Sequence, residues 1–253
     1  MIGSPSPDRR PPVTHDARDP RSPARPATTC RGRDVRRGLG LAVLAGLALI
    51  GVYAAAVLTP EGQYLDDRLM LWAANRLPGQ GRSAQLLGLV SAGTVLLAGL
   101  ALGLLALVVH GPRRAVAVVA TVGATPVLAR LLKVVLDRPE LVDGAAGNSL
   151  PSGHTAAVAG LAAGLVLAVP RLLNGTALLA GAAAAGVAGA ATVLLRWHRP
   201  SDVVAAVLLA AVVGGIAHAL APPARRTVTR REPKDRPDDA RTATTTERGA
   251  PVR

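Results

Sequence analysis

Six apolar stretches constrain this chain more than any other feature, because each approaches the length that crosses a lipid bilayer. They lie at roughly 38–59, 84–109, 115–136, 154–169, 176–196 and 201–221. A membrane-spanning helix needs about 20 mostly apolar residues, and the run at 154–169 is the shortest of the set. The pattern predicts an all-α fold, a polytopic membrane bundle of six transmembrane helices over 38–221.

The two ends of the chain have a different composition. Residues 1–37 and 222–253 are rich in Pro, Arg, Asp, Ser and Thr and have no apolar period, so both are predicted to be disordered tails. The formal net charge of +13 would suggest a nucleic-acid partner in a soluble protein. Here the basic residues gather in the tails and the apolar residues in the middle, which indicates membrane lipids as partners and no nucleic acid.

Arginines cluster beside the apolar runs in four segments, whereas the predicted outer loop at 60–83 mixes acidic residues with arginines and has no strong net bias. The arginines of the four segments precede the first run, join the second to the third and the fourth to the fifth, and follow the sixth: Arg31, Arg33, Arg36, Arg37, Arg113, Arg114, Arg171, Arg225, Arg226, Arg230 and Arg231. With six spans these four segments share one face, which the positive-inside rule assigns to the cytoplasm. The prediction is a multi-pass protein of the cell membrane with both termini cytoplasmic.

Three polar segments then fall on the opposite, outer face. Their sequences are ARLLKVVLDRPE at 129–140, NSLPSGHTA at 148–156 and RWHRPSD at 196–202. Each segment has a structural alternative: Lys133 could pair with Asp137 along a helix, Ser152 could be an N-cap, and His198 with Asp202 could cap a helix start. Ionisable groups at membrane depth are costly and usually mark a site or a paired contact, so the convergence of all three favours a site.

Groups suited to binding an anion occur in two of these segments. Lys133 and Arg138 supply positive charge. The Ser152 hydroxyl and the backbone amides near Gly153 lie at a predicted helix N-terminus, which favours anions. Glycine at this position lets the backbone approach a ligand closely.

Two histidines and a carboxylate supply the reactive groups. His154 and His198 can serve as general acid and nucleophile. Asp202, one helical turn after His198, can hold that imidazole in one tautomer, as a carboxylate does in a catalytic triad. Together with the cationic groups, these residues point to phosphoryl transfer from an amphiphile, with the site on the extracytoplasmic face.

The three segments resemble the signature of the type 2 phosphatidic acid phosphatases, the lipid phosphate phosphatases related to the vanadium haloperoxidases. That family carries Lys-x6-Arg-Pro, Pro-Ser-Gly-His and Ser-Arg-x5-His-x3-Asp. The sequence PSGH at 151–154 matches in full, His198 and Asp202 match the third motif, and Lys133 matches the first. The resemblance covers roughly 85–220, which is the predicted motif-bearing core.

The resemblance implies a reaction without metal or cofactor. His198 would attack phosphorus and become phosphohistidine, His154 would protonate the leaving oxygen, and Asp202 would orient His198. The phosphate would lie against Lys133, Ser152 and Gly153 until water hydrolyses the intermediate. The implied substrate is a lipid phosphate or a polyprenyl diphosphate in the outer leaflet.

The first and third motifs are degenerate. Counting from Lys133, the family's Arg-Pro falls at Glu140 and Leu141, whereas this chain has Arg138 and Pro139; the family's Ser-Arg falls at Ala191 and Thr192. One hypothesis is that Arg138 and Arg196, or else Arg199, replace the two phosphate-binding arginines. The alternative is a non-catalytic or weakly active member that binds lipid phosphate or keeps only the fold. A vanadate-dependent peroxidase fits poorly, because the chain lacks a large soluble domain.

Overall fold

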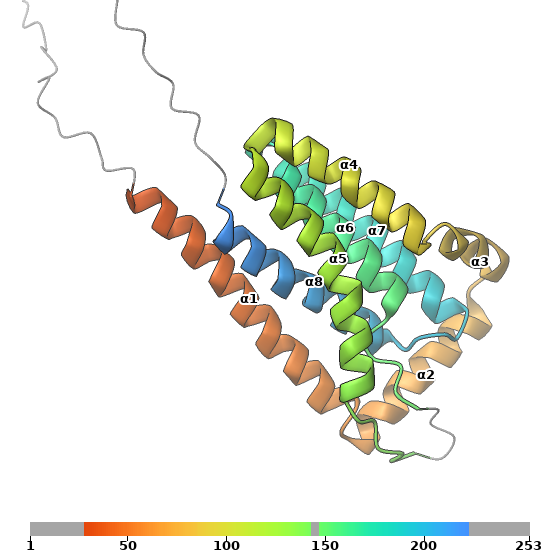
Figure 1. The fold of residues 1–253 in the computed structure, drawn as a ribbon. Helices are drawn as coiled ribbons and strands as arrows, with labels where there is room; N and C mark the ends of the chain where they lie inside the picture. The colour runs from red at the N-terminus through yellow and green to blue at the C-terminus, as the bar shows by residue number, and fades with distance from the viewer. Residues whose placement is uncertain (1–27, 143–146, 223–253) are drawn as a thin grey trace, which may run out of the picture. The chain divides into compact units, whose positions relative to one another are not determined.

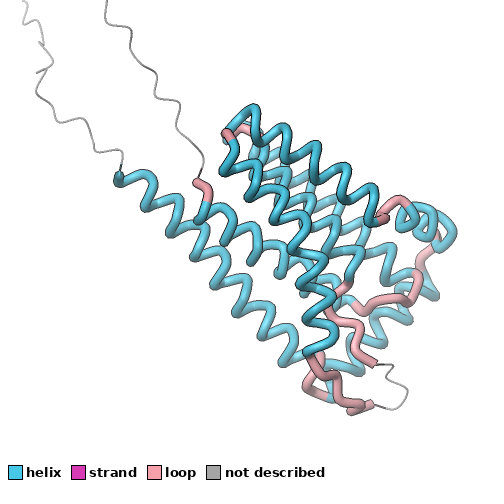
Figure 2. The backbone as a smooth tube through the Cα atoms, viewed as in Figure 1, coloured by secondary structure: helices cyan, strands magenta, loops and turns pink. Residues whose placement is uncertain are grey.

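The computed structural model describes residues 28–142 and 147–222, and this part of the chain is helical with no strand (Figures 1 and 2). The helices are α1 (Thr28–Ala56), α2 (Pro60–Arg76), α3 (Gln80–Gly88), α4 (Ala92–His110), α5 (Pro112–Val135), α6 (Gly153–Ala168), α7 (Asn174–Leu194) and α8 (Pro200–Leu220), with the 3-10 turn η1 (Arg171–Leu173) before α7. The all-α prediction is confirmed for these residues.

Five helices within the described residues are long and apolar enough to cross a membrane: Gly32–Ala56, Ala92–His110, Pro112–Val135, Arg171–Leu194 and Pro200–Leu220. The remaining predicted span is α6, which has 16 residues. At 1.5 Å per residue it extends about 24 Å, less than the bilayer's apolar core of about 30 Å. Of the six predicted spans, five therefore correspond to helices long enough to cross a membrane, and the sixth, α6, is a shorter apolar helix.

The first helix begins earlier than predicted. Helix α1 starts at Thr28, whereas the sequence placed a disordered tail up to residue 37. The last proline before the helix is Pro26, and no later residue up to the apolar run prevents helix formation, so the helix continues into the basic segment. The predictions of disorder for 1–27 and 223–253 lie outside the described residues.

The connection between the first two predicted spans, residues 60–83, and the start of the second span also differ from the prediction. Helix α2 occupies most of this connection and begins at a Thr59 cap, whose Oγ1 accepts from Gly62 N at 3.0 Å. The apolar run at 84–109 is interrupted before α4, where Ser91 Oγ accepts from Thr94 N at 3.2 Å and Thr94 Oγ1 accepts from Ser91 N at 3.0 Å. This reciprocal cap starts a new helix, although hydropathy alone suggests a continuous one.

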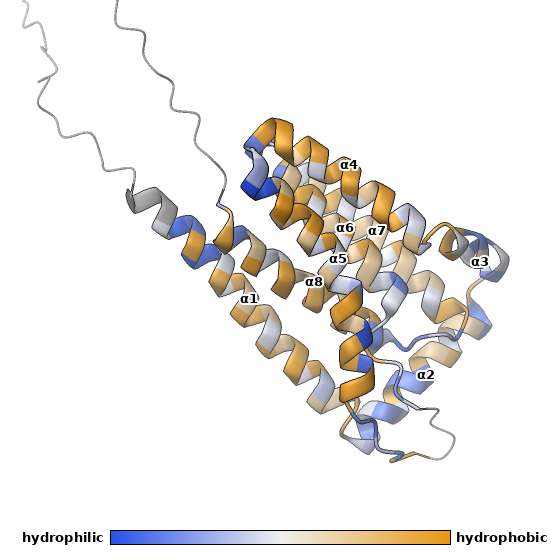
Figure 3. Ribbon diagram, viewed as in Figure 1, coloured by the Kyte–Doolittle hydropathy of each residue, from blue (hydrophilic) through white to orange (hydrophobic). Residues whose placement is uncertain are grey.

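Helix α6 lies in the middle of the bundle and packs against α4, α5, α7 and α8. Small residues allow this: a Cβ added at Gly164 would come within 2.8 Å of Val122 Cγ2, and one at Gly181 within 2.6 Å of Ala162 Cβ. Hydrophobic residues make up most of α4 and the middle parts of α1 and α5, while hydrophilic ones collect mainly toward the ends of the bundle (Figure 3). The Ala- and Gly-rich sequence thus produces close helix packing.

Helix α1 lies along α8 (Figure 1). The contact is closest at two glycines: a Cβ added at Gly38 would lie 2.6 Å from Gly215 O, and one added at Gly215 would lie 2.7 Å from Gly38 O. Neither position can accept a side chain without separating the helices.

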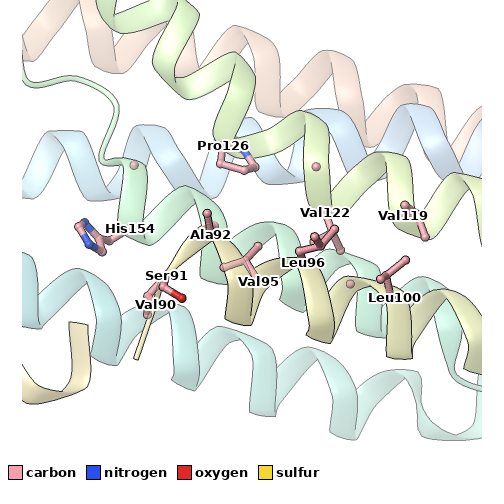
Figure 4. Close-up of a pocket in the computed structure, with 14 residues that line it drawn as sticks. Val90, Ser91, Ala92, Val95, Leu96, Leu100, Val119, Val122, Pro126 and His154 are labelled. Carbon is pink, nitrogen blue, oxygen red and sulfur yellow. The ribbon is translucent and has the colours of Figure 1, made fainter. Parts of the chain in front are cut away.

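Helix α5 bends near Pro126, as the sequence predicts for a proline inside a helix. Figure 1 shows α5 changing direction part-way, and Figure 4 places Pro126 at the bend. The bend turns the end of α5, which carries Lys133, away from the direction of the preceding portion, whose Val119 and Val122 pack on α4.

Candidate active site

The three polar segments meet at one end of the bundle, where α5 ends and α6 and α8 begin. Asn148 joins the second segment to the first, because its Nδ2 donates to Lys133 O at 3.1 Å and to Leu136 O at 2.7 Å. The second segment contacts the third through Ser152 N, which donates to Asp202 O at 3.0 Å. The convergence predicted from the sequence is present, whereas the side of the membrane stays a prediction.

His198 and Asp202 form a buried pair at the start of α8. His198 Nδ1 lies 3.1 Å from Asp202 Oδ2, and Asp202 is fully buried. The same Oδ2 accepts from Arg199 N at 2.9 Å and so also caps the helix. The capping alternative and the triad-like pairing are therefore both present, and the cap fixes the carboxylate against the imidazole.

His154 is the second residue of α6 and stands beside the buried pair. Its ring centroid is 5.7 Å from that of Trp197, with 41° between the ring planes. His154 also lies within electrostatic reach of His198 and Lys133. One histidine of α6 and one from the segment just before α8 thus lie near the same lysine.

The start of α6 offers backbone amides next to open space. Ser152 is the N-cap: its Oγ accepts from Thr155 N at 3.4 Å and from Thr155 Oγ1 at 3.0 Å. This leaves the amides of Gly153 and His154 without partners inside the helix. A Cβ at Gly153 would meet nothing within 4 Å, so an anion can approach this helix end closely.

Lys133 opens onto a cavity of about 520 Å3 that Arg130, Pro151 and Gly153 also line. Lys133 is within electrostatic reach of Asp202. No ion pair between Lys133 and Asp137 occurs in the described residues, which removes the simple helix-pair explanation for this lysine. The cavity therefore combines a cation with the open end of α6.

Arg138 is the least compensated charge of the site. Its side chain is 1% exposed, its nearest carboxylate is Asp66 at 3.9 Å, and none of its three guanidinium nitrogens has a hydrogen-bond partner. Burial lowers the pKa of Arg138, and the neighbouring Arg199 lowers it further. A buried guanidinium with free donors is suited to receiving an anion.

Arg196 is placed differently. Its side chain is exposed and donates to Asn75 Oδ1 on α2. Among residues 28–142 and 147–222, no side-chain hydrogen bond or ion pair joins Arg196 to His198, His154 or Lys133. The hypothesis that Arg196 binds phosphate stays a prediction, and the buried Arg199 is the arginine that the fold holds beside Asp202.

Helix α2 contributes carboxylates that the sequence patterns missed. Asp66 accepts from Ser201 N at 2.9 Å and from Ser201 Oγ, while Asp67 accepts from Arg199 Nε. Burial raises the pKa of Asp66. Gln63 lies on the same helix face, one turn earlier, and donates to Pro139 O at 2.7 Å. In the sequence, the i, i+3 and i+4 spacing of Gln63, Asp66 and Asp67 was the one signal that these side chains share a helix face.

An apolar groove of about 450 Å3 leads away from His154 between α4, α5 and α6 (Figure 4). Figure 4 shows His154 at one end and Leu100 and Val119 toward the other. The groove and the cavity beside Lys133 share Pro126 and Gly153. A polar cavity and an apolar groove therefore meet at the start of α6.

The part of the chain that carries the candidate site matches a known protein family. The family model described as the PAP2 superfamily matches residues 89–226. The chain belongs to the PAP2 superfamily. Searches of curated proteins and of solved structures found no match. The match contains all three polar segments, and it confirms the resemblance to the type 2 phosphatidic acid phosphatases.

PAP2 members are generally phosphatases, so family membership supports a phosphoric ester hydrolase associated with the membrane. Among residues 28–142 and 147–222, no group of three or more His, Cys, Asp or Glu side chains is arranged to hold a metal ion. The described part of this PAP2 domain places the cationic side chains of Lys133 and Arg138 within electrostatic reach of Asp202.

Proposed function

We propose that this PAP2 protein removes phosphate from a lipid phosphate or polyprenyl diphosphate in the outer leaflet, through a phosphohistidine on His198. The observation that carries the proposal is the 3.1 Å contact between His198 Nδ1 and Asp202 Oδ2, near His154 of α6. With its Nδ1 proton donated to Asp202, His198 keeps the lone pair on Nε2 for attack.

The reaction has two steps. Nε2 of His198 forms a bond to phosphorus as the bond to the lipid oxygen breaks, and His154 gives its proton to that oxygen. Water then attacks the phosphohistidine, His154 takes the proton from that water, and inorganic phosphate leaves. Asp202 stabilises the imidazolium character of His198 in both steps.

Charge on the transferring phosphoryl group is met by fixed donors. We assign this role to Lys133, Arg138 and the amides of Gly153 and His154, with the Ser152 hydroxyl as the N-cap of the same helix end. Arg199, held by Asp67 and by Ser149 Oγ at 3.0 Å, extends the positive surface toward α8. Such preorganised donors stabilise charge that develops in the transition state.

The amphiphilic nature of the substrate follows from the junction of the two hollows. A phosphate at the end of α6 would have the polar cavity beside Lys133 on one side and the apolar groove on the other. A hydrocarbon chain fits the groove, whereas a soluble ester would leave it empty. We therefore expect long-chain substrates to have the lower KM.

The direct test is phosphate release by purified protein from phosphatidate, a polyprenyl diphosphate and a soluble aryl phosphate. His198→Ala should abolish release from all three, since it removes the nucleophile. His154→Ala should slow the lipid esters most, because an aryl oxygen leaves without a proton. Normal turnover by His198→Ala would exclude this mechanism.

The groove is tested separately with Gly123→Leu, which places a side chain where Gly123 lines it and nothing lies within 4 Å. The matched control is Gly186→Leu on α7, which also meets nothing within 4 Å and lines no described hollow. Gly123→Leu should raise KM for the lipid substrates and leave the aryl phosphate unchanged. An equal effect on both substrate types would refute the groove's role.

A non-catalytic lipid-phosphate binder is the second candidate. The observation that favours it is the engagement of Arg196 by Asn75 and of Arg199 by Asp67. Of the three arginines considered as phosphate clamps, this leaves Arg138 with unpartnered donors. This candidate predicts binding of phosphatidate without phosphate release. Loss of that binding in Lys133→Ala, with an inert parent protein, would establish it.

A further inference from the structure

A second groove lies on another face of the bundle, between α1 and α7 with α6 and α8 as its floor. Its volume is about 450 Å3, within the range of about 300–1,000 Å3 that proteins use for small apolar ligands. Small residues make up the floor and close it, because α6 and α8 approach closely: a Cβ added at Gly214 would lie 3.2 Å from Ala163 Cβ. The side chains of Leu41 and Leu178, 52% and 61% exposed, stand along it.

The groove ends in positive charge at the end of the bundle opposite the candidate active site. Arg37 and His218 line this end, and His218 lies within electrostatic reach of Arg37, Arg114 and Arg171. The carboxylate within the same reach is Asp34, which already pairs with Arg171 at 2.6 Å. Arginines therefore outnumber the carboxylates here.

Helix ends at the same place would repel an anion through their carbonyl groups. Arg114 offsets this, because its Nε donates to Leu167 O at 2.9 Å and its Nη1 donates to Ala221 O. These acceptors are neutral, so the positive charge of Arg114 persists beside the groove. The mouth thus keeps a positive potential despite the C-termini of α6 and α8.

We propose that this groove binds one anionic phospholipid, with an acyl chain along the small residues of α6 and α8 and the headgroup phosphate beside Arg37. Basic pockets between membrane helices bind acidic headgroups by this combination of charge and apolar contact. The site is separate from the reaction. Its charged mouth lies at the C-terminal end of α6, whereas His154 lies at the N-terminal end of the same helix. The proposal does not depend on the phosphatase activity.

The probe is phosphatidylglycerol, a phosphodiester, compared with zwitterionic phosphatidylcholine by native mass spectrometry of the full chain from detergent. We expect one phosphatidylglycerol to bind in preference to phosphatidylcholine. Arg37→Gln should weaken that binding about fivefold, the effect of removing about one lipid-facing charge. Arg113→Gln, an exposed arginine at the same end that does not line the groove, is its matched control and should bind like the parent.

The apolar part is tested with Ala182→Phe, which fills the groove from its exposed side, against Ala183→Phe on the same helix but outside the groove. The first variant should lose the tight phosphatidylglycerol and the second should keep it. Equal binding of the two lipids, or equal behaviour of the two variants, overturns the proposal. A chain dimer that Ala182→Phe dissociates, with unchanged lipid binding, would assign the groove to a second copy and also overturn it. If Ala182→Phe lowers the melting temperature, Arg37→Gln decides alone.

Discussion

Replacing Arg138 with methionine should reduce catalysis without reducing stability. The side chain is 1% exposed, makes no hydrogen bond through Nε, Nη1 or Nη2, and has its nearest carboxylate 3.9 Å away. In the absence of substrate, the desolvation cost of this buried cation is therefore offset by few hydrogen bonds or ion pairs. Methionine keeps much of the length and volume of the side chain and removes the charge.

The two effects have opposite signs. Replacing an under-paired buried ion by an apolar side chain of similar volume is neutral or stabilises by about 1–4 kcal/mol. Loss of a charge-assisted contact that matters mainly in the transition state costs about 2–4 kcal/mol. That cost corresponds to a rate reduced roughly thirtyfold to a thousandfold. Arg138→Lys should recover only part of the rate, because an ammonium cannot bind phosphate in a bidentate manner.

The assay measures phosphate release and the melting temperature in the same membrane-derived preparation at matched expression. Arg199→Met is the control, because Arg199 has Asp67 and Ser149 as partners. Breaking a buried pair costs about 3–5 kcal/mol, with the lower end expected because the Asp67 side chain is 22% exposed. Wild-type turnover in Arg138→Met would refute its role in phosphate binding. A stability loss equal to that of Arg199→Met would refute the claim that Arg138 is under-paired.

Three further predictions concern the His198–Asp202 pair, the packing of α1 on α8 and the orientation of the protein in the membrane. Asp202→Asn should reduce kcat by about 10⁴-fold, as loss of a tautomer-holding carboxylate does, while a decrease below tenfold in a steady-state assay would contradict the pairing. Gly215→Leu should lower the melting temperature in detergent by separating α1 from α8, and an unchanged melting temperature would show that the helices do not approach so closely. With Cys30→Ser as background, Glu140→Cys should react with an impermeant thiol reagent in intact cells and Leu172→Cys should not; the reverse pattern would invert the proposed orientation.

The pairing within the third motif was predictable from local spacing. His198 and Asp202 are four residues apart at a helix start, and this spacing puts their side chains on one side of the chain. For the second segment, the sequence predicted only that it lies at the same end of the bundle as the third. Its exact attachment depends on Asn148, whose amide bonds the last turn of α5, and no periodicity encodes that contact.

The contribution of α2 could not be read from the sequence in the same way. Asp66 contacts Ser201 across 135 residues, and a carboxylate in a polar segment gives no indication of such a partner. The break before α4 was hidden for a related reason, because hydropathy averages over Ser91 while helix initiation depends on its individual hydrogen bonds. Apolar length predicts membrane residence well, and it predicts helix ends poorly.

The contact between Gly38 and Gly215 affects what can be cut from this protein. The family match begins at residue 89, but α1 lies outside it and presses its backbone onto α8. A fragment that starts at the family boundary would expose to lipid the surface of α8 around Gly215 that α1 covers. It would also lose the carboxylates of α2. The smallest unit expected to fold with an intact site therefore starts at α1, so a functional fragment is larger than the family boundary implies.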